Sequence, residues 1–150
     1  IDAAPSLIKI GREIMPEFGL PEEKLRVMRI EDLSGSVDHV VCMNVLANVD
    51  DYRRPLERLL KVARKSVILR ESVIEGPGFT SYVKDHYLDP EVDLKVYVNA
   101  YPLSGWLAFI DSHDFDARVI MDERTRGEPE LVIDHPHHWK FFVATRRQPL

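Results

Sequence analysis

Cysteine is almost absent from this chain, with Cys42 alone among 150 residues. A single thiol cannot form an internal disulfide, so we expect a reducing, cytoplasmic setting. No apolar run approaches the ~20 residues that a membrane-spanning helix needs. The first residues also have no basic segment followed by an apolar stretch, so we expect no signal peptide.

The chain has no surplus of basic residues. Lysine and arginine number 20 against 25 acidic residues, which gives a net charge of -5. Proteins that bind the nucleic-acid backbone carry a basic surface, so neither nucleic acid nor a membrane is an expected partner. Hydrophobic residues make up 45% and charged residues 30%. This balance excludes a disordered tail and a membrane bundle, and it predicts one globular domain over residues 1–150.

Hydrophobic periodicity predicts three helices. The first begins at Pro5 and ends before Pro16, the second follows Asp50 and Asp51, and the third spans Leu103 to Ser112. Period-two or short apolar patterns predict strands over the ranges Lys24–Ile30, Val37–Met43, Ser66–Arg70, Ala117–Thr125 and Trp139–Arg146. The strand at Val37–Met43 is mostly apolar, which indicates a strand covered on both faces.

Strands that alternate with helices predict an α/β fold with an open, mostly parallel sheet. The final two strands have no helix between them, so we expect them to pair as an antiparallel hairpin. Residues 72–101 show no clear period and are long for a connection. They are rich in aromatic residues, which argues against disorder and indicates a lid or substrate-binding segment.

Four segments, in this order, resemble class I S-adenosylmethionine-dependent methyltransferases. They are IDAAPSLIKIGR at the start of the chain, Glu31-Asp32-Leu33, VDHVVCMNVLANV from Val37, and the stretch from Tyr101-Pro102-Leu103 to His113-Asp114-Phe115. The likeness spans nearly the whole chain. It implies a Rossmann-like methyltransferase sheet, S-adenosylmethionine as cofactor, and methyl transfer to oxygen or nitrogen. The charge balance and the aromatic segment at residues 72–101 indicate that the acceptor is a small molecule.

The family's glycine-rich loop has no counterpart in this sequence. The seven glycines are Gly11, Gly19, Gly35, Gly76, Gly78, Gly105 and Gly127, and none lies in a G-x-G turn between a strand and a helix. We therefore expect a domain incomplete at its N-terminus, with a strand-sized gap that a longer chain or another chain would fill. We also expect these residues alone to bind S-adenosylmethionine weakly or not at all.

The resemblance implies a set of cofactor-binding residues. Asp2, with the adjoining Ala3, stands where the family's acid accepts hydrogen bonds from the ribose hydroxyls; the alternative is that Asp2 only caps the following helix. Ile30 would pack on the adenine, and Glu31 and Asp32 would contact its amino group, unless they form a solvated turn. Asn44 would lie where cofactor and substrate meet, or it would only cap its loop.

The acceptor side has its own candidates. His86 is the candidate general base, although a histidine without a catalytic role is the alternative. Candidate substrate-binding residues are Asn48, Tyr82, Tyr87 and Tyr101, where the alternatives are loop capping for the asparagine and packing of the lid for the tyrosines. The run from Asp134 to His138 lacks further ligands at metal-binding spacing, so no metal is expected.

Two other functions compete with the methyltransferase. One is a degenerate methyltransferase-like domain that serves assembly without catalysis, as a homo-oligomer joined through its exposed sheet edge. The other is a different nucleotide-binding enzyme such as a dehydrogenase. The absent G-x-G-x-x-G and the expected terminal hairpin both argue against the dehydrogenase.

Overall fold

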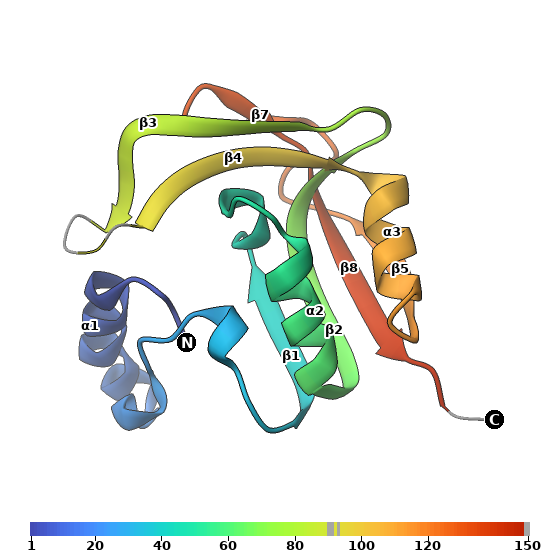
Figure 1. The fold of residues 1–150 in the computed structure, drawn as a ribbon. Coiled ribbons are helices and arrows are strands. Elements are labelled where there is room, and N and C mark those ends of the chain that lie inside the picture. The colour runs from blue at the N-terminus through green and yellow to red at the C-terminus, as the bar shows by residue number, and fades with distance from the viewer. Residues whose placement is uncertain (90–91, 93, 149–150) are drawn as a thin grey trace.

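The computed structural model describes residues 1–89, 92 and 94–148, although for residues 84–88 it describes the backbone alone. Figure 1 shows the arrangement of its elements. The helices are α1 (Pro5–Ile14), α2 (Arg53–Val62) and α3 (Leu103–Asp111), with single 3-10 turns η1 (Met15–Phe18), η2 (Glu22–Lys24), η3 (Ile30–Asp32) and η4 (Leu46–Asn48). The strands are β1 (Val37–Met43), β2 (Ala63–Ile74), β3 (Phe79–Asp89), β4 (Leu94–Pro102), β5 (Phe115–Met121), β6 (Glu130–Val132), β7 (His135–His137) and β8 (Trp139–Arg146).

Strand β2 is the centre of the sheet. It pairs in parallel with β1 on one edge and antiparallel with β8 on the other, and β5 continues the sheet beyond β8. The last residues of β2 pair in parallel with β4, which pairs antiparallel with β3. The predicted α/β class is confirmed, and so is the antiparallel C-terminal hairpin, which β5 and β8 form.

Helices α2 and α3 pack against the sheet to form the hydrophobic core. Leu56, Leu59 and Leu60 of α2 are buried at the predicted i, i+3, i+4 spacing. They belong to one cluster with Trp106 and Ile110 of α3 and with sheet residues that include Val67, Leu69 and Phe142. In Figure 1, α2 lies in front of β1 and β2. Because successive side chains of a strand point to opposite faces of the sheet, every second residue of these strands points towards the helices and into this core.

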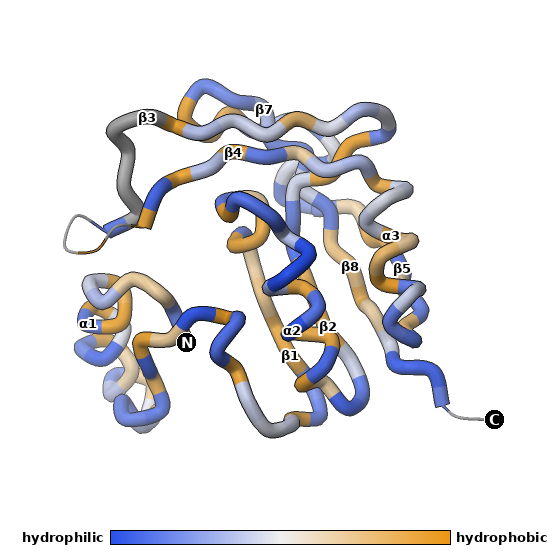
Figure 2. The backbone as a smooth tube through the Cα atoms, in the orientation of Figure 1, coloured by the Kyte–Doolittle hydropathy of each residue, from blue (hydrophilic) through white to orange (hydrophobic). Residues whose placement is uncertain are grey.

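The opposite face of the sheet is open at β1, so the expectation of a strand covered on both faces is wrong. Cys42 is buried on the α2 side, whereas its neighbours Val41 and Met43 are 62% and 37% exposed. Figure 2 shows hydrophobic residues along β1 and β8. Among the described residues, β1 pairs with β2 alone. Its second edge therefore leaves backbone N–H and C=O groups without a strand partner.

The N-terminal region packs loosely. Helix α1 forms as predicted, but only Ile8 is buried, and its apolar face of Leu7, Ile10 and Ile14 is exposed. The predicted strand over residues 24–30 is wrong. Val27 forms a single parallel bridge to Asp2, because that residue is the only strand partner the described chain offers there.

Strands β3 and β4 pair as a long antiparallel hairpin rather than forming an irregular connection. Strand β4 is buried on both sides over residues 98–101, which removes the alternation that sequence analysis relies on. The register of the hairpin also shifts between Tyr82 and Asp89. In Figure 1 the hairpin extends across the top of the molecule, from above α3 to above α1.

Candidate functional site

Asn44 lies at the carboxyl end of β1, where open α/β sheets bind ligands. Its backbone has φ +58°, a left-handed conformation that asparagine tolerates better than most residues. The Asn44 N–H donates to the carbonyl of Arg70 (2.8 Å), and Nη1 of Arg70 donates to Oδ1 of Asn44 (2.6 Å). Neighbouring β2 thus holds both the backbone and the side chain of this residue.

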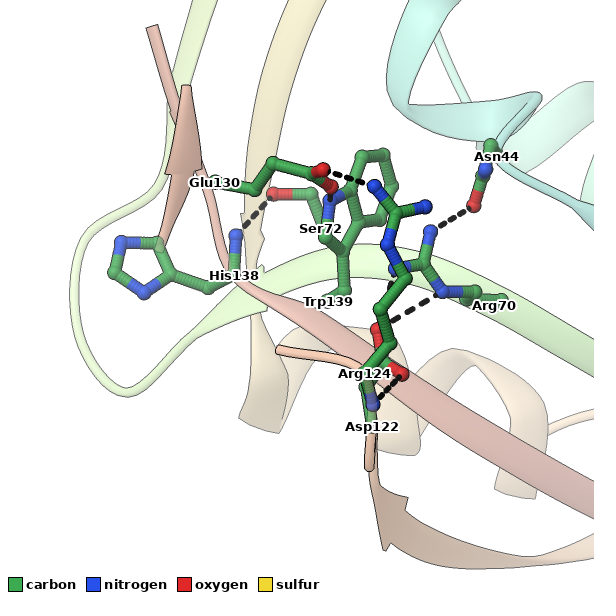
Figure 3. Close-up of polar contacts among 8 residues, drawn as sticks. All are labelled: Asn44, Arg70, Ser72, Asp122, Arg124, Glu130, His138 and Trp139. Atoms are coloured by element: carbon green, nitrogen blue, oxygen red, sulfur yellow. Dashed lines mark hydrogen bonds and ion pairs between the residues drawn. The ribbon is translucent and has the colours of Figure 1, made fainter. Parts of the chain in front are cut away.

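Arg70 is the centre of a polar network on the open face of the sheet (Figure 3). Its guanidinium forms a buried ion pair with Asp122 and stacks on the ring of Trp139, with 4.5 Å from Cζ to the ring centroid. Burial opposes ionisation of Asp122, but hydrogen bonds from Arg70 and from the Arg124 N–H lower the pKa of this carboxyl.

The same network continues to the β6–β7 hairpin. The Trp139 indole N–H donates to Oε2 of Glu130 (2.8 Å), and Arg124 pairs with the other oxygen of Glu130. The His138 N–H donates to Oγ of Ser72 (3.1 Å). These contacts connect the loop after β5 and the start of β8 to the end of β1, so Arg70 is held on several sides.

Glu71 follows Arg70 in β2 and points to the core face. Its carboxylate is fully buried and accepts the N–H groups of Val45 (3.2 Å), Leu46 (3.0 Å) and Ala47 (2.8 Å). Burial raises the pKa of Glu71 to about 7 in spite of these three donors. The side chain of Glu71 therefore binds the segment Val45–Ala47, which includes the start of η4, to β2.

The β3–β4 hairpin is anchored on η4. Nδ2 of Asn48 donates to the Tyr97 carbonyl (3.0 Å), and the Tyr101 hydroxyl donates to the Leu46 carbonyl (2.7 Å). Nδ2 of Asn99 donates to the Val49 carbonyl (2.6 Å) and to the Tyr101 hydroxyl (2.8 Å). Burial raises the pKa of Tyr101, which is neutral at ordinary pH. Asn48 and Tyr101 thus hold the base of the hairpin in place.

The aromatic candidates are not all at one place. Tyr101 packs in the core against Tyr52 and Trp106, with ring centroids 4.5 and 5.6 Å away. Tyr82 lies on the hairpin, is 44% exposed and contacts Tyr97. His86 and Tyr87 are in β3, but their side chains lie outside the described residues.

Asp2 lies at the entrance to α1. One carboxylate oxygen accepts the Ala4 N–H (2.8 Å), and no described residue donates to the other oxygen. Ala4 is the N-cap of α1, which has no side-chain cap hydrogen bond at that residue, so the contact lies before the helix and the capping alternative is wrong. Asp2 and Ala3 are half-buried. Ser6, in the first turn of α1, donates its N–H to Asp89 at the end of β3 (2.9 Å). The hairpin therefore contacts the N-terminal region as well as η4.

The three adenine-loop candidates form η3. Ile30 is half-buried and packs against the core, Glu31 is half-buried, and Asp32 is exposed. Helix α2 lies beside this turn. A shallow depression there is lined by Glu31, Arg54, Glu57, Arg58 and Lys61. The structure brings Asn44 together with Arg70, and Asn48 together with the hairpin. Among the described residues, no hydrogen bond connects the three adenine-loop candidates to either asparagine.

Sequence reasoning missed Arg70, Glu71 and Asp122. A signal for two of them was present, since Arg70-Glu71 interrupts the apolar run from Val67 to Val73. Adjacent charges inside a buried strand need partners on both faces of the sheet. Asp122 gives no such signal, because it follows β5 and its partner is 52 positions away.

Cys42 and His137, which belong to the remaining sequence motifs, are both buried. Cys42 is a buried free thiol whose pKa is raised by burial and by the nearby Glu71. His137 is buried against Trp139, with ring centroids 4.6 Å apart. Among the described residues, no three His, Cys, Asp or Glu side chains are placed to hold a metal. Within this same part of the chain, every helix is too short or too polar to span a membrane.

Solved structures share this fold. A methyltransferase from Methanosarcina mazei is 16% identical, with TM-score 0.63 over 97% of this chain and 79% of that one. The N-terminal domain of EvdMO1, solved with S-adenosylhomocysteine, is 16% identical, with TM-score 0.64 over 94% of this chain and 60% of that one. A Burkholderia thailandensis 1,6-didemethyltoxoflavin-N1-methyltransferase is 12% identical, with TM-score 0.54 over 82% of this chain.

This chain spans about half the length of the Burkholderia enzyme, 50%. No protein-family model matches the sequence, and no curated protein matches it either. The likeness lies in the order and arrangement of the helices and strands. The chain has the fold of class I S-adenosylmethionine-dependent methyltransferases.

Proposed function

We propose that this domain takes part in S-adenosylmethionine-dependent methyl transfer to a small-molecule acceptor. The observation that carries the proposal is the loop Asn44–Asn48, which has an asparagine at each end and which β2 holds at the carboxyl end of β1 in a methyltransferase fold. Ligands of open α/β sheets bind at this end of the strands. Several similar structures contain S-adenosylmethionine or S-adenosylhomocysteine.

The described residues fit the nucleoside half of this cofactor. Asp2 has a half-buried carboxylate with one oxygen open to a donor, which suits a ribose hydroxyl. Ile30 presents an apolar, half-buried side chain next to Glu31, which suits an adenine. The sequence has no glycine-rich turn for the methionine half. We therefore expect binding in the millimolar range by these residues alone.

In the proposed reaction the bound cofactor supplies an electrophilic methyl group on a sulfonium. The protein aligns the acceptor and excludes water. Asn44 and Asn48 would orient the acceptor or the cofactor, and the β3–β4 hairpin, anchored at both ends, would exclude solvent. His86 is the proposed base for an acceptor that must lose a proton, and Tyr82 and Tyr87 are the proposed wall of the acceptor pocket.

The acceptor class follows from charge and from the hairpin. A net charge of -5 disfavours a nucleic-acid acceptor, and the aromatic residues of the hairpin favour a small cyclic or apolar molecule. The similar Burkholderia enzyme was solved with 1,6-didemethyltoxoflavin, a small molecule. Oxygen and nitrogen acceptors both remain within this proposal.

The test is a titration of the isotope-labelled chain with S-adenosylhomocysteine, followed by the amide signals in NMR spectra, which detect millimolar binding. We expect saturable shifts at Asp2–Ala4, Ile30–Asp32 and Asn44–Asn48. Asp2→Asn should weaken binding severalfold, while Asp134→Asn, on an exposed turn, should not. A spectrum that does not change at millimolar ligand, or shifts confined to other regions, would contradict the proposal.

We propose assembly as the second candidate function, through the open edge of β1 between two copies of the chain. The observation that favours it is the exposure of Val41, Met43 and Val37 along this strand. Edge strands with apolar residues are templates for pairing. Light scattering would show a dimer that Val41→Lys dissociates. A chain that is monomeric at high concentration would exclude this candidate.

A further inference from the structure

Two consecutive residues of β2 hold the loop after β1 from opposite faces of the sheet. Arg70 reaches the open face and contacts Oδ1 of Asn44. Glu71 reaches the core face and accepts the N–H groups of the next three residues, at 2.8–3.2 Å. The loop therefore has a fixed partner for each backbone N–H from residue 44 to residue 47.

The chemistry of Glu71 suits this position closely. A carboxylate offers two acceptor oxygens and no donor, so it can take three converging N–H groups. Oε1 accepts from Val45 and Leu46, and Oε2 accepts from Ala47. A glutamine here would direct its NH₂ group at one of these donors. The Tyr101 hydroxyl donates a hydrogen bond to the Leu46 carbonyl and so holds the start of η4 as well.

We propose that Glu71 is a positioning residue that sets the loop Asn44–Asn48 for ligand binding, an inference that rests on the proposed function. The loop carries Asn44 in its left-handed conformation at one end and Asn48 against β4 at the other. Neither asparagine is bonded to Glu71. The carboxylate acts on them through the three residues between them. Release of those three would loosen the loop and so weaken the placement of both asparagines, whose side chains bond to Arg70 and Tyr97.

The protonation state of Glu71 controls the loop. Its surroundings contain Arg70 of the same strand, Cys42 of β1 and Tyr101 of β4, and the last two are neutral because burial raises the pKa of each. The pKa of Glu71 is about 7. Protonation replaces one acceptor by an O–H donor, so the loop loosens as the pH falls through this value. Ligand affinity should therefore increase as the pH rises.

The experiment compares the wild type with Glu71→Gln and with Glu75→Gln, a matched change on the exposed turn after β2. Hydrogen exchange of the Val45–Ala47 amides measures the loop without ligand, and we expect it to be about tenfold faster in Glu71→Gln alone. The dissociation constant of S-adenosylhomocysteine should rise about tenfold in the same variant. Wild-type affinity should increase across pH 7, and that of Glu71→Gln should not.

The outcomes separate this inference from the proposed function. If the wild type binds S-adenosylhomocysteine and Glu71→Gln binds it equally at every pH, the role of Glu71 is overturned and the proposed function stands. If the wild type does not respond to the ligand, the proposed function is overturned, whatever the exchange rates show. If Glu71→Gln does not fold, the pH profile of wild-type affinity decides, and a flat profile overturns the inference.

Discussion

The two sides of β1 differ sharply in how they are packed. On the side of β2 the sheet continues through β8 and β5, and α2 and α3 bury a core that includes Phe142 and Trp106. On the other side lie α1, whose apolar face is exposed, and a single bridge between Asp2 and Val27. Asn44 and Asn48 are bonded to β2 and β4 on the packed side, and the ribose candidate Asp2 lies on the open one.

This difference indicates which parts of the site are set in advance. Asn44 is held by backbone and side-chain bonds to Arg70, which is itself fixed by Asp122 and Trp139. Asp2 is joined to its surroundings through a short turn and one bridge. We therefore expect the ligand to meet a rigid surface at the end of β1 and an adjustable one at Asp2.

The largest contrast should appear in core truncations. Phe142→Ala, in a fully buried position, should lower the free energy of unfolding by about 3–5 kcal/mol. Leu7→Ala, on the exposed face of α1, should change it by no more than about 0.5 kcal/mol. Urea unfolding followed by circular dichroism measures both. A cost for Leu7→Ala close to that of Phe142→Ala would show that α1 is packed as tightly as the sheet.

The pH dependence of stability sharpens the contrast at Glu71. Burial raises the pKa of Glu71 to about 7 in the folded chain, against an ordinary 4.5 for a solvent-exposed glutamate. The native state therefore binds more protons between these values, and its stability falls as the pH rises through them. The free energy of unfolding of the wild type, measured relative to that of Glu71→Gln, should therefore fall by roughly 3 kcal/mol from pH 4.5 to 7.

The comparison of the two unfolding free energies reports on Glu71 alone, because the other titrating groups are present in both proteins. Denaturant unfolding at a series of pH values measures both. A wild-type curve parallel to that of Glu71→Gln would mean that the carboxyl does not titrate in this range.

The buried ion pair should matter more than the exposed ones. Asp122→Asn leaves the Arg70 guanidinium without its charged partner beneath Trp139, and we expect it to lower the free energy of unfolding by about 2 kcal/mol. Asp38→Asn, which removes an exposed pair with Arg64 and Lys65, should have no measurable effect. Equal midpoints for the two variants in urea would refute this ranking.

The smallest effect is expected at the contact between the hairpin and α1. Asp89→Asn keeps the shape of the side chain but removes the negative charge that accepts the Ser6 N–H. The Ser6 amide should then exchange about fivefold faster, equivalent to ~1 kcal/mol, because a charge at a helix N-terminus is lost. Exchange at the Leu56 amide of α2 is the internal reference. An unchanged ratio of the two rates would show that Asp89 does not restrain α1.

The helices and strands on the packed side of β1 could be predicted from the sequence. The spacing of Leu56, Leu59 and Leu60 and the apolar strand at residues 139–146 identified helix, strand and core, because those residues meet partners close to them in the fold. Leu7 and Val41 could not be assigned in this way. Their patterns are equally apolar, and exposure depends on which elements cover them, which local spacing does not encode.

The site was predictable only in part. A resemblance to a family pointed to Asn44 and Asn48, and the structure places both on one loop. The residues that hold this loop were missed, because Arg70 and Glu71 act across strands that are distant in the sequence. Tyr101 was expected at the acceptor, whereas the structure buries it as an anchor of the hairpin.

The most direct test of the account is the position of a bound nucleoside on the chain. Intermolecular NOEs from S-adenosylhomocysteine would locate it. We expect contacts from the ribose protons to Ala3 and from the adenine protons to Ile30, with the homocysteine end towards Asn44. Contacts to Val41 and Phe141 on the open face of the sheet, with none to these three residues, would contradict it.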